Sequence, residues 1–269
     1  MSRRPGSPPL PPAFNPMQPL PRRRWLQRLC RLWPLLPAAN TFAYAPASKG
    51  LSERVLLLGD SLTVGPFGDN LQNFLIDQYS DRGVGVIAVC GCSPEHWLGD
   101  EPVFSSRCGY RYKRPGDLRL GRYENGVPPK SFPVPKLESI LRSWRPSVLL
   151  VQLGTNWFDR LAEDEKTLTS LEPILDRFAS TVRNSLPLAT LVWITPPDSS
   201  RFRRVQHGVT RLIKQAGIRH RFRVIDSSEM IRYESGKSGG DGVHLSTPAA
   251  DLWAEKVKRK LRPLLGTPD

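Results

Sequence analysis

The sequence predicts a three-layer α/β/α fold with a five-stranded parallel sheet. Two observations lead to this expectation. After Gly50, short apolar segments that end at turn residues alternate with longer segments of helical pattern. Short apolar runs of this kind are typical of parallel strands that are buried on both faces. Repeated strand–helix alternation then places helices on both faces of the sheet, joined by right-handed crossovers.

Five short apolar segments are expected to form the strands. The first ends at Gly59-Asp60-Ser61, the second at Cys90-Gly91-Cys92, the third at Gly154-Thr155-Asn156 and the fourth at Pro196-Pro197. Glycine, asparagine and aspartate favour turns, and proline ends a central strand. The expected strands cover about 54–58, 84–89, 147–153, 190–194 and 222–225.

The segments between and after these strands are expected to be helices, with one exception. The exception is 93–134, which shows no regular pattern and is too long for a plain connection. We expect it to be a binding loop or lid inserted into the domain. The expected helices cover about 66–79, 135–144, 165–186, 201–216 and 247–265.

Residues 1–50 differ from the predicted domain at 51–269. They carry eight Lys/Arg and no Asp or Glu, and 1–21 are proline-rich and expected to be disordered. Arg22-Arg23-Arg24-Trp25-Leu26-Gln27 resembles a bacterial twin-arginine signal, and the small residues at Ala43-x-Ala45-x-Ala47 are typical of a cleavage site. We expect export to the periplasm or cell envelope. The alternative is a disordered basic tail on a cytoplasmic protein.

The net charge of +14 is partly a property of this leader, since the remaining residues carry 31 basic and 25 acidic side chains. No basic stripe coincides with a nucleic-acid-binding motif, so nucleic acid is not an expected partner. The apolar part of the leader is too short and too interrupted for a stable membrane span. We expect a monomer without a membrane-spanning helix.

Polar or glycine motifs follow three of the expected strands, and a fourth motif precedes the last helix. They are Gly59-Asp60-Ser61, Gly91, Gly154-Thr155-Asn156 and Asp241-Gly242-Val243-His244. Ligands of open α/β sheets bind at the carboxyl ends of the strands, so the first three motifs are expected at one edge. Taken alone, the Gly-Asp-Ser motif is better explained by Asp60 or Ser61 acting as a helix N-cap.

The four motifs in this order resemble the SGNH hydrolases, also called the GDSL esterase/lipase family, over 54–260. The resemblance implies a flavodoxin-like SGNH fold and a serine esterase without a cofactor. It also implies that Ser61 is the nucleophile, His244 the general base and then acid, and Asp241 the carboxylate that orients His244. A serine hydroxyl needs such a base to become nucleophilic, and the base needs a partner that fixes its tautomer.

The resemblance further implies an oxyanion hole formed by the backbone N–H groups of Ser61 and Gly91 and by the side-chain amide of Asn156. Glycine at position 91 allows the backbone to approach the developing oxyanion closely. One departure from the family pattern is Trp157, which stands where an aspartate is usual and is expected to change the wall of the site.

A second serine motif, Gly236-Lys237-Ser238-Gly239-Gly240, matches the G-x-S-x-G pattern of another hydrolase class. That motif requires a strand before the serine and a helix after it, and Ser238 has neither. We interpret it as a flexible approach to the loop that carries Asp241 and His244.

Three cysteines lie in the predicted domain. In an exported protein Cys108 can pair with Cys90 or Cys92 and anchor the long insertion. The alternatives are free thiols or a zinc site that includes His96, although the spacing is not the usual C-x₂-C. No metal is expected.

The insertion combines aromatic and basic side chains, which suits an acylated glycan. Trp97 and Tyr110, together with Trp157, are the candidate substrate contacts, because exposed rings can stack on sugars. The alternative is that these rings only pack the insertion onto the domain. The hypothesis is therefore an exported esterase for short acyl groups, such as O-acetyl, on carbohydrate or peptidoglycan. An acyltransferase with the same triad, a lipid esterase and an inactive glycan-binding module are the rivals.

Overall fold

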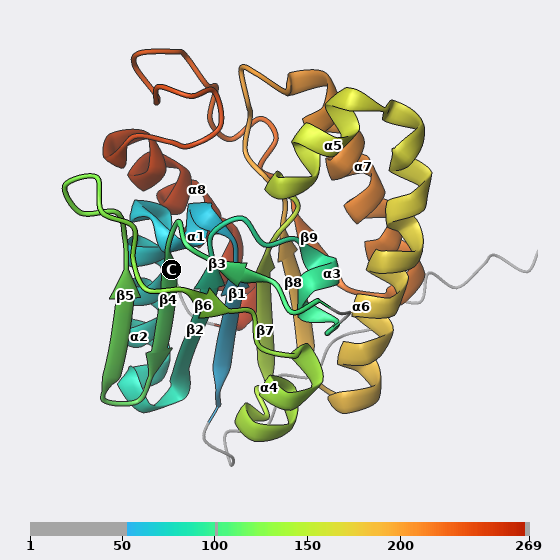
Figure 1. The fold of residues 1–269 in the computed structure, drawn as a ribbon. Helices are drawn as coiled ribbons and strands as arrows, with labels where there is room; N and C mark the ends of the chain where they lie inside the picture. Colours follow the sequence, from blue (N-terminus) through green and yellow to red (C-terminus); the bar gives the residue numbers. More distant parts are fainter. Residues whose placement is uncertain (1–52, 100–101, 267–269) are drawn as a thin grey trace, which may run out of the picture. The chain divides into compact units, whose positions relative to one another are not determined.

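The computed structural model describes residues 53–99 and 102–266 (Figure 1). The chain divides into two units, Met1–Ala45 and Pro46–Asp269, and every described residue belongs to the second. The expected leader with its export signal therefore lies outside the described residues. In the part that is described, no helix is both long enough and apolar enough to cross a bilayer.

Five parallel strands form the centre of the sheet, as the sequence predicts. They lie in the order β2-β1-β7-β8-β9 and each neighbouring pair is parallel. The carboxyl ends of β2, β1 and β7 are therefore neighbours, so the residues that follow them meet at one edge. The strands are β1 Val55–Gly59, β2 Val84–Val89, β7 Val148–Gln152, β8 Thr190–Ile194 and β9 Arg223–Ile225.

The sheet continues beyond β2 with an antiparallel hairpin, so over the described residues it has seven strands rather than five. Strand β4, Tyr110–Arg114, pairs with β2, and β5, Asp117–Gly121, pairs with β4 (Figure 1). Two short strands, β3 Ser105–Ser106 and β6 Phe132–Pro133, pair with each other in a separate sheet. The insertion at 93–134 is therefore not an irregular loop, because its hairpin covers the edge of the parallel sheet.

Helices cover both faces of the sheet because successive residues of each strand point to opposite faces. Leu56 and Leu58 of β1 pack with α4, α6 and α7, whereas Val55 and Leu57 pack with α2 and α8. Both faces are therefore apolar, which explains the continuous apolar character of the strands. These helices are α2 Pro66–Gly83, α4 Leu137–Trp144, α6 Glu172–Ser185, α7 Arg203–His220 and α8 Thr247–Leu265.

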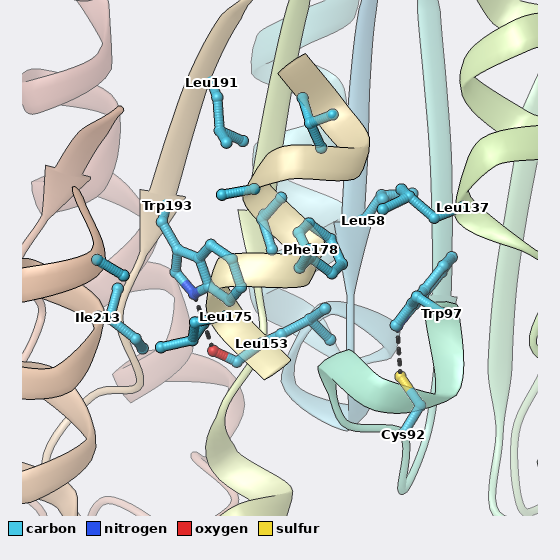
Figure 2. Close-up of a cluster of buried hydrophobic side chains, with 14 of the residues drawn as sticks. Leu58, Cys92, Trp97, Leu137, Leu153, Leu175, Phe178, Leu191, Trp193 and Ile213 are labelled. Atoms are coloured by element: carbon cyan, nitrogen blue, oxygen red, sulfur yellow. Dashed lines mark hydrogen bonds between the residues drawn. The ribbon is translucent and has the colours of Figure 1, made fainter. Parts of the chain in front are cut away.

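Figure 2 shows the core on the α6 face of the sheet. Trp193 of β8 packs edge-on against Phe178 of α6, with ring centroids 5.2 Å apart. Its indole Nε1 donates a hydrogen bond of 3.0 Å to the carbonyl oxygen of Leu153, so the buried polar atom has a partner. This bond joins β8 to the end of β7, where a candidate site residue follows.

Short helical segments connect the main elements. The helix expected at 165–186 is divided, because Pro173 lies in the first turn of α6 and starts a new helix there. The residues before it form a 3₁₀-helix instead. The short segments are α1 Ser61–Val64, α3 Pro94–Trp97, η1 Thr155–Trp157, α5 Phe158–Glu163 and η2 Glu165–Leu171.

Candidate active site

Ser61 is the first residue of α1, directly after β1. Asp60 caps this helix, because its Oδ1 accepts a hydrogen bond of 3.0 Å from the backbone N–H of Leu62. A Cβ at position 59 would lie 2.2 Å from Oγ1 of Thr63, so only glycine allows the chain to turn this tightly. The Gly-Asp-Ser sequence thus fixes Ser61 at the carboxyl edge of the sheet.

Ser61, His244 and Asp241 form a continuous chain of hydrogen bonds. Nε2 of His244 lies 2.9 Å from Oγ of Ser61, and Nδ1 of His244 lies 2.5 Å from Oδ2 of Asp241. Oδ1 of Asp241 accepts hydrogen bonds from the backbone N–H groups of Val243 and His244, at 2.9 and 2.7 Å. The carboxylate therefore has both oxygens occupied, and it fixes the orientation of the imidazole ring.

The electrostatics of Asp241 suit a residue that stays ionised. Partial burial raises its pKa, but hydrogen bonds from the His244 ring and from the backbone N–H groups of Val243 and His244 outweigh burial and lower the pKa to about 2. Asp241 is therefore a carboxylate at neutral pH, and it stabilises a positive charge on the neighbouring imidazole.

Two residues that sequence reasoning missed hold the loop of Asp241 and His244 in place. The hydroxyl of Tyr233 donates to the carbonyl oxygen of His244 at 3.2 Å and accepts from the N–H of Gly242 at 3.0 Å. The hydroxyl of Ser199 donates to the carbonyl oxygen of Gly242 at 2.6 Å. Neither residue belongs to a motif, so the sequence carries no local signal for this role.

Ser238 lies in the turn before this loop and is nearly buried. Its hydroxyl donates to the carbonyl oxygen of Arg232 and accepts from the N–H of Glu234, each at 3.2 Å. Its carbonyl oxygen accepts a hydrogen bond of 2.6 Å from the N–H of Ser246. The Gly-rich segment is therefore an ordered turn tied to its surroundings, rather than the flexible approach expected from its composition.

The two other candidate oxyanion-hole residues follow the strands on either side of β1. Gly91 follows β2 and has a φ of +81°, a conformation that favours glycine. Asn156 follows β7, and its Nδ2 donates a hydrogen bond of 2.7 Å to the carbonyl oxygen of Cys92. A side-chain amide has two N–H donors, so the second remains for a ligand while the first fixes the orientation of the side chain.

The three aromatic side chains expected to contact substrate are buried or half-buried. Trp97 and Trp157 are 0% and 1% exposed. The indole Nε1 of Trp97 donates to Sγ of Cys92, and that of Trp157 to Oε2 of Glu95. Tyr110 is half-buried and stacks on Phe132, with centroids 4.4 Å apart. Burial removes both tryptophans from the candidate substrate contacts, since neither ring has a face free for a sugar.

Cys90 and Cys108 form a disulfide, which is one of the two pairings predicted from the sequence. Cys92 is a buried free thiol whose pKa is raised well above its usual value by burial. Because Cys90 and Cys108 are bonded to each other, the alternative zinc site has lost two of its four ligands. Among the described residues, no group of three His, Cys, Asp or Glu side chains could hold a metal ion.

A small apolar pocket of about 80 Å³ opens beside the hydroxyl and the imidazole. Its lining includes Ser61, Pro66, Phe67, His244 and Trp253. Phe67 and Trp253 stack with their ring centroids 3.7 Å apart, and both are buried. The pocket is small and mostly apolar, so it suits a short apolar group attached to a carbonyl carbon.

A hydrogen-bonded Ser-His-Asp set at the carboxyl edge of a parallel sheet defines a class of hydrolytic enzymes. The chain belongs to the GDSL-like lipase/acylhydrolase family, whose model matches residues 55–257. The match covers every residue of the predicted Ser-His-Asp set and of the oxyanion hole.

Three individual proteins illustrate the similarity. Protein BcsX of Komagataeibacter xylinus is 23% identical over 217 residues, which are 78% of this chain and 77% of that protein. Axe2, an acetylxylan esterase from Geobacillus stearothermophilus, matches in structure with a TM-score of 0.54 at 16% identity, over 79% of this chain and 95% of that one. TesA matches with a TM-score of 0.54 at 17% identity, over 79% of this chain and all of that one. The two structures share the fold of this chain.

Proposed function

We propose that this protein is an exported serine esterase that hydrolyses short acyl esters, foremost O-acetyl esters of carbohydrate or peptidoglycan. The observation that carries the proposal is the hydrogen-bonded chain from Ser61 through His244 to Asp241. Ser61 lies near the start of the described chain, and Asp241 and His244 lie near its end. Membership of the GDSL-like family supports the roles of nucleophile, orienting carboxylate and base for these three residues.

In the proposed mechanism, Oγ of Ser61 attacks the ester carbonyl carbon while Nε2 of His244 accepts its proton. The N–H groups of Ser61 and Gly91 and the amide of Asn156 stabilise the oxyanion of the tetrahedral intermediate. His244 then gives the proton to the leaving alcohol, and an acyl group remains on Ser61. A water molecule, activated by His244 in the same way, releases the acid and restores the enzyme.

The preference for short acyl groups is supported by the pocket beside Ser61. Its volume of about 80 Å³ suits an acetyl or slightly longer chain, and its walls include two stacked buried rings, Phe67 and Trp253. The structural similarity to Axe2, an acetylxylan esterase, supports an acetylated carbohydrate as the substrate. The twin-arginine-like leader and the Cys90–Cys108 disulfide support export, since disulfides persist in oxidising compartments.

The test is hydrolysis of p-nitrophenyl acetate, butyrate and octanoate by the purified protein, followed by acetate release from acetylated xylan and O-acetylated peptidoglycan. We expect turnover that is fastest on acetate and lost in Ser61→Ala. The matched control is Ser170→Ala, an exposed serine on η2 outside the site, which should keep wild-type rates. Equal activity of Ser61→Ala and wild type would refute the assignment, and faster turnover of octanoate would refute the acyl class. Transfer of the acyl group to an added sugar in place of water would indicate an acyltransferase.

A further inference from the structure

The helix that carries Ser61 is a single turn of four residues, Ser61–Val64. Such a short helix has little intrinsic stability, because nucleation costs more than one turn of hydrogen bonds returns. The carbonyl groups in its last turn have no partner within the helix and need one elsewhere. The position of Ser61 therefore depends on whatever holds the end of α1.

Two arginines from the insertion bind those carbonyl groups. Arg111 of β4 donates from Nε to the carbonyl oxygen of Thr63 and from Nη2 to that of Val64, each at 3.2 Å. Arg122, which follows β5, donates from Nε and Nη2 to the same oxygen of Val64 at 3.2 and 2.7 Å. We call this pair, Arg111 and Arg122, the guanidinium clamp.

Partners on α2 bind both arginines of the clamp. Asp69, in the first turn of α2, accepts from Arg111 and, at 2.7 Å, from Arg122. Nη1 of Arg111 also donates to Oε1 of Gln72 at 3.1 Å. The side chain of Arg111 is 0% exposed, and a buried charge is tolerated only when it is paired and hydrogen-bonded in this way. The clamp thus joins the hairpin, the end of α1 and the start of α2.

The hairpin that carries the clamp is itself firmly anchored. Strand β4 pairs with β2 along Val86–Val89, and the N–H of Cys90 donates to the carbonyl oxygen of Gly109 at 2.9 Å. The Cys90–Cys108 disulfide lies next to the same turn. Because β2 is a central strand, the clamp transmits the rigidity of the sheet to the helix of the nucleophile.

We infer that Arg111 and Arg122 are positioning residues that hold α1 so that Oγ of Ser61 meets the imidazole of His244 in reactive geometry. The inference rests on the proposed role of Ser61 as nucleophile. It assigns to the insertion a task in the reaction that differs from that of a lid, since the clamp residues act on the backbone of α1 and not on the substrate.

The test compares Arg111→Met with Lys113→Met in the full protein. Lys113 is a matched control, because it is a buried cation on the same strand whose ion pair and hydrogen bonds go to Asp81 and Arg114 and not to the carbonyl groups of α1. Small misplacements of a reacting group lower the rate strongly, so we expect Arg111→Met to lower kcat on p-nitrophenyl acetate about 10- to 100-fold while KM changes little. Lys113→Met should retain the wild-type kcat. Equal losses in both variants, or no loss in Arg111→Met, would overturn the inference.

A second variant covers the case in which Arg111→Met does not fold. Arg122 is only partly buried, so Arg122→Ala leaves a space that a free guanidinium ion can enter from solvent. We expect its kcat to fall, and guanidinium chloride below the unfolding range to restore part of the loss. A loss that guanidinium does not reverse, while Lys113→Met remains unaffected by the salt, would count against positioning by the clamp.

Hydrogen exchange separates this inference from the proposed function, because it needs no turnover. The N–H groups of Thr63, Val64 and Gly65 donate to carbonyl oxygens of Asp60 and Ser61. We expect these amides to exchange faster in Arg111→Met than in Lys113→Met. If wild type lacks Ser61-dependent turnover, the proposed function fails, and the exchange rates still decide whether the clamp holds α1.

Discussion

Asp60 is a carboxyl group in an environment that opposes its ionisation. It is 0% exposed, and burial raises its pKa to about 6 even though the Leu62 N–H group donates to it. Its Oδ2 is buried and has no hydrogen-bond partner. The residue beside the candidate nucleophile therefore caps a helix at an electrostatic cost that depends on pH.

We expect Asp60→Asn to raise the free energy of unfolding relative to wild type by an amount that depends on pH. The folded pKa lies above the usual value of 3.8, so the folded state binds more protons than the unfolded state between these values. Wild-type stability should therefore fall as pH rises from about 4 to about 6, by up to about 3 kcal/mol, and stay level above that range. Asparagine is about as good an N-cap as aspartate, and it carries no charge. In thermal unfolding from pH 4 to 8, the unfolding temperature of the variant should rise relative to that of wild type as pH rises. A constant difference across this range would contradict the assignment.

Among the elements, the hairpin β4–β5 was the hardest to foresee, and its strand β4 carries one of the two proposed positioning residues. Its strand β4 reads Tyr-Arg-Tyr-Lys-Arg, and the buried positions are Arg111 and Lys113. Alternation of apolar residues is the usual sign of a half-buried strand. Here the inward side chains are cations whose partners, Asp69 and Asp81, lie on α2 about 30 to 40 residues earlier. Only the folded chain shows that these charges are paired.

The disulfide should contribute to stability by anchoring this hairpin. Cys90 and Cys108 close a loop of 18 residues, for which the chain-entropy model gives about 3 kcal/mol. We expect Cys108→Ser to lose about this free energy of unfolding in urea, and dithiothreitol to produce the same loss in wild type. The control is the variant treated with dithiothreitol, which should show no further loss. If the reductant destabilised both proteins equally, the disulfide would not be the cause.

The parallel strands were predictable because a strand that is buried on both faces is a short run of consecutive apolar residues. All five parallel strands and the last helix, 247–265, were expected close to their observed bounds. The nucleophile motif and the Asp241–His244 motif were singled out because, in order with the two other motifs, they resemble a known family; each motif alone is too short to predict a role. Tyr233 and Ser199 were missed because they act through hydrogen bonds to a loop that is remote from any motif. Trp97 and Trp157 were expected at the surface because composition does not tell a stacking ring from a core ring.

At the scale of the whole molecule, the pocket is formed from two distant parts of the chain. Leu245 forms part of its wall beside His244, and its side chain is half-buried. Leu245→Ala should enlarge the pocket and raise kcat/KM on butyrate relative to acetate by about tenfold, since one methylene in an apolar pocket is worth about 1–3 kcal/mol. The measurement is the ratio of kcat/KM for the two p-nitrophenyl esters. An unchanged ratio would mean that the acyl group does not bind in the pocket that Leu245 lines.

The order in which the chain is made has a consequence for when activity can arise. Ser61 and His244 are 183 residues apart, and Asp241 lies just before the last helix. A ribosome therefore completes the hydroxyl, the clamp and most of the sheet long before it adds the base. Nascent chains and products truncated before position 241 carry the serine with no imidazole to activate it. Under the proposed mechanism, the protein becomes an esterase only after position 244 has been made and His244 has folded back onto Ser61.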